Sequence, residues 1–121
     1  MNLQNLTGSP DNVMPVIRVY KNTVQLNRRA CLLLGLAPHS RVNVVTDTDT
    51  GKIYIHRSED PASYRLNNFK GRFGKRINST KLATALCEAL GGQGAYRIDE
   101  NWAGTNRHAE SLHEIIATAV S

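Results

Sequence analysis

The chain has few of the residues that cross-link or anchor small proteins. It contains only two cysteines, and aromatic residues make up 6% of its 121 positions. Cys31 and Cys87 both fall within apolar patterns of helical spacing, which favours buried, reduced thiols over a disulfide. A disulfide-stapled scaffold is therefore not expected, and the thiols indicate a reducing, cytoplasmic environment.

The sequence also lacks an apolar run near the roughly 20 residues that a membrane-spanning helix needs. Its first residues show neither the basic start nor the apolar stretch of a secretory signal peptide. Residues 1–14 have no periodic pattern and include the run Gly-Ser-Pro-Asp-Asn, so we interpret them as a flexible leader. We expect a cytoplasmic protein with no membrane partner and a single domain over residues 15–121.

Clusters of side chains that support catalysis or metal binding are missing as well. The four histidines, His39, His56, His108 and His113, are spread along the chain, and none is beside a cysteine. Zinc sites and Cys-His nucleophile pairs need such groups close together. No catalytic residue, metal or cofactor is therefore predicted, and each histidine is interpreted as an exposed polar residue. A deep pocket in which His56 meets an acid would instead indicate an enzyme.

Positive charge is what the sequence has in excess. Fifteen Lys and Arg residues against ten Asp and Glu residues give a net charge of +5. Residues 16–60 hold seven basic and four acidic residues, residues 61–92 hold six and one, and residues 93–121 hold two and four. This distribution favours a polyanionic partner, and a solvated basic surface that only maintains solubility is an equal alternative.

The chain from residue 16 is typical of short strands and helices in alternation. In its first half we expect strands over residues 16–20, 23–26, 41–46 and 52–57, and a helix over residues 28–34. Asn27 is a suitable N-cap for this helix, and Gly35 is a suitable end. Lys21-Asn22 and residues 47–51 are the expected turns.

The second half presents the same order of elements. Strands are expected over residues 64–69, 72–77 and 95–99, with a turn at Lys70-Gly71, a polar loop over 100–107 and a strand or short helix over 112–120. Apolar residues at helical spacing predict a helix over residues 79–90 with Asn78 as its cap and Gly91 as its end. Cys31 precedes Leu34-Gly35 by the spacing at which Cys87 precedes Leu90-Gly91, which indicates an internal repeat.

The pattern thus predicts an α+β domain made of two similar β-β-α-β-β units, over about residues 16–57 and 64–120. A unit of this size buries too little apolar surface to be stable alone. We therefore expect the two units to pack together within one chain, which would need no oligomer in order to fold. The alternative is that the two halves match by chance, because many α+β domains alternate short strands and helices.

Four short segments of the first unit carry a resemblance to a known family. They are Val24-Gln25-Leu26-Asn27-Arg28-Arg29-Ala30, Leu34-Gly35-Leu36, Arg41-Val42-Asn43-Val44 and Lys52-Ile53-Tyr54-Ile55. In these segments the chain resembles the swapped-hairpin fold of AbrB-like transition-state regulators and MazE-type antitoxin DNA-binding domains. The resemblance implies a fused, swapped-hairpin-like pseudo-dimer. The family pattern usually has Pro where this chain has Asn27 and Asn78, and Gly where it has His39.

The resemblance also implies non-catalytic binding of double-stranded DNA, as in a small transcriptional regulator or an antitoxin-like module. The residues expected to contact DNA phosphates are Lys21, Arg72, Lys75, Arg76 and Lys81, and those expected to read bases are Arg18, Arg28 and Arg29. Tyr64, Phe69 and Phe73 are interpreted as packing residues rather than as a platform for stacking unpaired bases. The alternative is a protein-interaction or structural module that has the same fold and does not bind nucleic acid.

Overall fold

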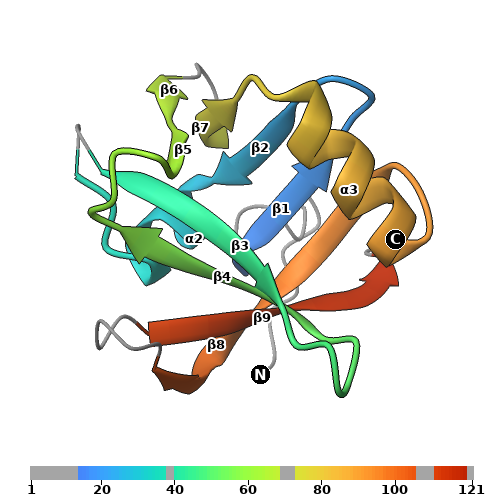
Figure 1. Ribbon diagram of the computed structural model, residues 1–121. Helices are drawn as coiled ribbons and strands as arrows, with labels where there is room; N and C mark the ends of the chain where they lie inside the picture. The colour runs from blue at the N-terminus through green and yellow to red at the C-terminus, as the bar shows by residue number, and fades with distance from the viewer. Residues whose placement is uncertain (1–13, 38–39, 69–72, 106–110, 120–121) are drawn as a thin grey trace, which may run out of the picture.

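The computed structural model describes residues 14–37, 40–68, 73–105 and 111–119 of the chain. The strands of these residues all belong to one antiparallel sheet, in the order β5-β3-β4-β9-β8-β1-β2-β7-β6 (Figure 1). They are β1 (Val16–Val19), β2 (Val24–Asn27), β3 (Arg41–Thr46), β4 (Ile53–Ser58), β5 (Tyr64–Arg65), β6 (Asn67–Asn68), β7 (Phe73–Ile77), β8 (Gly94–Thr105) and β9 (Ser111–Ala119). The described residues also form two helices, α2 (Arg28–Leu33) and α3 (Thr80–Leu90).

Residues 64–68 bring the two ends of the strand order together. β5 pairs with β3 at one end, and β6 pairs with β7 at the other. Because a single residue, Leu66, joins β5 to β6, the sheet curls into a nearly closed barrel. Leu66 is 9% exposed and belongs to the core. The same short segment therefore closes the sheet and fills its interior.

The core consists of aliphatic side chains on the inward face of the strands. Where β1 and β2 pair, Ile17 stands opposite Leu26 and Val19 opposite Val24, and all four are at most 1% exposed. Helix α3 adds one apolar face to this core, made of Leu82, Ala83, Leu86 and Leu90. Each fully buried Leu, Ile or Val contributes about 1.5–3 kcal/mol to stability, so the barrel interior is the main stabilising element.

Asn27 links three parts of the chain through one buried amide group. Its Oδ1 accepts hydrogen bonds from the backbone N of Ala30 at 2.9 Å and of Val16 at 3.0 Å. Its Nδ2 donates to the backbone O of Met14 at 2.8 Å, and the residue is 0% exposed. The sequence prediction that Asn27 caps α2 is confirmed. The side chain also fixes the start of β1 against the end of β2.

The predicted fold class is wrong. The described residues are mostly strand rather than α+β, and strands from the two halves of the chain interleave: β1 pairs with β8, β2 with β7 and β4 with β9. The two packed β-β-α-β-β units of a fused, swapped-hairpin-like pseudo-dimer are therefore replaced by one shared sheet. Local sequence patterns indicate where a strand forms, but its partners are chosen by long-range packing.

Several local expectations also changed. The polar loop expected over residues 100–107 is, as far as residue 105, the second half of β8, and the last segment is a strand, β9. Ser79 rather than Asn78 caps α3, because its Oγ accepts from Leu82 N at 3.1 Å. Most of the expected leader and the Lys70-Gly71 turn lie outside the described residues. No helix in the described ranges is long and apolar enough to cross a membrane.

Replacing Asn27 tests its linking role. Asn27→Ala is expected to lower the free energy of unfolding by about 2–4 kcal/mol, because it removes the N-cap and leaves the buried Val16 amide without this acceptor. Urea denaturation followed by circular dichroism measures the change. Ser79→Ala, which removes only the cap of α3, is the control and should cost about 1 kcal/mol. Equal losses in the two variants would contradict the linking role.

Candidate nucleic-acid interface

Two neighbouring segments of the fold contain no acidic residue. The sequence has no Asp or Glu over residues 14–46 or over residues 61–87, and all ten acidic residues lie outside these ranges. The first range supplies β1, β2 and α2, and the second supplies β6, β7 and the start of α3. β2 pairs directly with β7, so the two ranges lie side by side in the sheet. The cations on these elements therefore have no carboxylate within their own stretch of sequence.

Arg18 and Arg76 stand in one row across the outward face of this part of the sheet. Arg18 lies opposite Gln25 on the neighbouring strand, and Gln25 lies opposite Arg76 on the next. Their sequence neighbours Ile17 and Ile77 belong to the core, so the pleat turns the two arginines outward. Two strand spacings separate their Cα atoms by roughly 10 Å. Both arginines are partly buried.

Lys21 and Lys81 lie at one end of the β2–β7 pair. Lys21 is in the turn between β1 and β2, Lys81 is in the first turn of α3, and both are exposed. The hydroxyl of Thr80 donates a hydrogen bond to Asn22 Oδ1 at 3.4 Å, which holds the turn beside the start of the helix. Two ammonium groups from distant parts of the sequence are thereby brought to the same end of the ladder.

Arg28 and Arg29 lie at the opposite end, in the first turn of α2, and both are exposed. Gly74 allows α2 to approach β7 this closely. A β-carbon at Gly74 would lie 2.9 Å from Cys31 Sγ and 3.6 Å from Arg28 Cα. Lys75 differs from the other cations because it stands opposite the core residue Leu26 and is partly buried.

Seven of the eight residues predicted to contact DNA fall within the described chain, and Arg72 lies outside it. Six of the seven lie on the outward face of β1 and β7 or on the segments at the two ends of the β2–β7 pair, and we name them the basic surface. They are Arg18, Lys21, Arg28, Arg29, Arg76 and Lys81. Lys75 lies on the same strand but faces the other way.

Two histidines differ from the sequence prediction of exposed polar residues. His56 is 4% exposed and His113 is 5% exposed. The Nδ1 atom of His56 lies 2.8 Å from the backbone O of Arg57, and that of His113 lies 2.9 Å from the backbone O of Asp99. Because a carbonyl oxygen only accepts, each Nδ1 carries a proton and donates it.

Side chains alternate between the inward and outward faces along β9, and this alternation is a signal for the burial of His113 that the sequence interpretation missed. This residue is two positions before the buried Ile115, so both point to the same side of the strand. His39 and His108 lie outside the described residues. Within the described ranges, no group of three or more His, Cys, Asp or Glu residues could hold a metal ion.

Comparison with known proteins identifies no relative of this chain. No protein-family model, curated protein or solved structure matches this chain. The functional inference therefore depends on the residues of the molecule itself and on the chemistry that they support.

Replacing Gly74 tests how closely α2 packs on β7. Gly74→Ala is expected to lower the free energy of unfolding by about 1–3 kcal/mol, because its β-carbon would overlap Cys31 Sγ. Cys31→Ala removes that sulfur, so the double variant should recover most of the loss. Urea denaturation of the four proteins gives the coupling energy, expected at about 1 kcal/mol or more. Strictly additive effects would mean that the two groups are not in contact.

The Cys31 thiol makes stability sensitive to alkaline pH. Burial raises the pKa of Cys31 from 9.0 to about 11, and the positive charge of Lys75 partly opposes the rise. Between these values the unfolded chain has lost the thiol proton and the folded chain retains it, so stability falls as pH increases from 9 to 11. Cys31→Ala should show a smaller decline when urea denaturation is repeated across this interval. An unchanged decline would contradict the raised pKa.

Proposed function

We propose that the protein binds double-stranded DNA, without catalysis, through the basic surface. The observation that supports this proposal is the pairing of two acid-free segments, which gathers cations from positions as distant as Arg18 and Lys81 around one ladder. Cations gathered on one part of a protein attract a polyanion electrostatically. The resemblance of residues 16–57 to AbrB-like and MazE-type DNA-binding domains favours the same partner.

The exposed cations have two different tasks in this proposal. Lys21 and Lys81 each present a compact ammonium group that neutralises phosphate and releases counterions. Arg28 and Arg29 present planar guanidinium groups at the start of a short helix, and such groups donate two hydrogen bonds to a guanine edge in the major groove. The protein would then act as a small transcriptional regulator or an antitoxin-like module.

Fluorescence anisotropy with a labelled duplex of about 25 base pairs tests the proposal. Affinity should fall between 50 and 200 mM KCl, because each phosphate contact contributes about 0.9 to the slope of log K against log salt. Lys21→Gln and Lys81→Gln should each weaken binding and reduce that slope by about one. The weakening should be similar for duplexes of unrelated sequence, since ammonium–phosphate contacts do not read bases.

Lys52→Gln is the matched control. Lys52 is also an exposed lysine at a hairpin turn, but it lies 3.9 Å from Glu114 and outside the basic surface. The variant has the same net charge as Lys21→Gln and should bind the duplex about as tightly as the unmodified chain. Absence of binding at 50 mM KCl, or an equal loss in Lys52→Gln and Lys21→Gln, would overturn the proposal. Binding only to an acidic protein would favour an interaction module instead.

A further inference from the structure

Helix α2 turns its most exposed apolar side chain away from the core. Leu32 is 73% exposed, the highest value among the large apolar side chains of the described residues. The two leucines that follow it are placed differently. Leu34 is 7% exposed and belongs to the core, and Leu33 lines a pocket of about 710 Å³ together with Ser58 and His113. Leu32 belongs neither to the core nor to the lining of this pocket.

Arg28, Leu32 and Arg29 form one continuous face of α2. Since an α-helix turns about 100° per residue, Leu32 lies about 40° round the helix from Arg28 and about 60° from Arg29, and therefore between them. All three side chains are exposed. On the other side of the helix, Ala30 is 0% exposed and Cys31 packs against the core. The helix thus presents an apolar group between two guanidinium groups, and we name these three exposed residues the α2 face.

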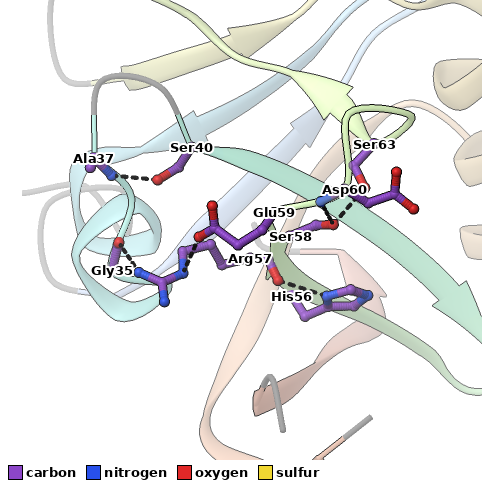
Figure 2. Close-up of polar contacts among 9 residues, drawn as sticks. All are labelled: Gly35, Ala37, Ser40, His56, Arg57, Ser58, Glu59, Asp60 and Ser63. Carbon is purple, nitrogen blue, oxygen red and sulfur yellow. Dashed lines mark hydrogen bonds and ion pairs between the residues drawn. The ribbon is translucent and has the colours of Figure 1, made fainter. Parts of the chain in front are cut away.

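Hydrogen bonds hold α2 at both ends and so fix the direction of the α2 face. At the start of the helix, Asn27 Oδ1 accepts from Ala30 N at 2.9 Å. Just after its end, the backbone O of Gly35 accepts from Arg57 Nη1 at 3.3 Å, as Figure 2 shows. Arg57 Nε also lies 3.8 Å from Glu59 Oε1, so the carboxylate at this end has a cation beside it (Figure 2). A helix that is already held in place loses little conformational freedom when it binds a partner.

The α2 face matches the major-groove edges of two neighbouring bases. Guanine presents two acceptors, O6 and N7, to which one guanidinium group donates two hydrogen bonds, and thymine presents a methyl group that an apolar side chain contacts. Three residues along an α-helix cover about 4.5 Å, and one step of B-DNA covers about 3.4 Å. Arg29 and Leu32 therefore reach bases about one step apart. The two arginines favour a polyanion over an uncharged apolar partner for this face.

We infer that Leu32 contacts the methyl group of a thymine that lies next to a guanine in the major groove of DNA. The inference rests on the proposed binding of double-stranded DNA and adds the base step that the protein prefers. Arg28 or Arg29 binds the guanine edge, while Leu32 removes the thymine methyl group from water. Loss of this single methyl contact should weaken binding about fourfold, the effect of leaving one CH₂-sized group in water.

Replacing thymine by uracil removes this methyl group and leaves the base-pairing groups unchanged. The probe is a labelled duplex in which one strand repeats T-G, so that every register places a thymine beside a guanine, and a second duplex has uracil at each thymine. In fluorescence anisotropy at about 50 mM KCl, the unmodified chain should bind the thymine duplex about fourfold more tightly. Leu32→Ala should bind the two duplexes equally. Circular dichroism should show this variant folded, because an exposed helical position accepts alanine well.

Lys21→Gln is the matched control for base reading. It should weaken binding to both duplexes to a similar extent and keep the ratio between them, since an ammonium–phosphate contact does not read bases. Equal affinity of the unmodified chain for the two duplexes, or an unchanged ratio in Leu32→Ala, would overturn the inference and leave DNA binding intact. Absence of binding to either duplex would overturn both proposals. A dimer that Leu32→Ala converts to a monomer in sedimentation velocity would place a second copy on the α2 face and also overturn the inference.

Discussion

The pairing of residues 64–68 with both ends of the sheet is the constraint on which the rest of the structure depends. β5 hydrogen-bonds to β3 and β6 to β7, while Leu66 between them enters the core. Without this bridge, β3 and β7 would each have an open edge. With it, the β2–β7 ladder that supports the basic surface and the β4–β9 ladder belong to one barrel. A pocket lined by Leu33, Leu34, Ser58 and His113 lies beside the β4–β9 ladder.

Helix α2 connects the basic surface to the pocket. It begins at the buried Asn27 cap, presents Arg28 and Arg29 in its first turn and ends at the apolar wall of the pocket. Its six residues span about 9 Å, so the basic surface and the pocket are close together. Asn27 fixes the helix to β1, and Gly74 allows it to contact β7. The position of the exposed arginines is therefore set by backbone geometry as well as by charge.

The sequence located the basic residues but not the pocket. Lys21, Arg28 and Lys81 could be identified because exposed cations cluster along the chain in segments that lack acids, and a charged side chain stays at the surface wherever its strand pairs. His113 and Asp60 come from separate segments, and their meeting with Leu34 depends on the curvature of the barrel and on the β4–β9 register. No spacing within the sequence records such a meeting.

Short-range physics explains what the sequence determined by itself. The Asn27 cap, the left-handed Gly91 that ends α3 and the positions of most strands depend on side chains within a few residues of one another, so a local pattern indicates them. The predicted α+β class and its two packed units failed because strand pairing is a competition among distant segments. Only the tertiary structure decided that β2 pairs with β7 and β4 with β9, since these pairings bury one shared core that neither half of the chain could form alone.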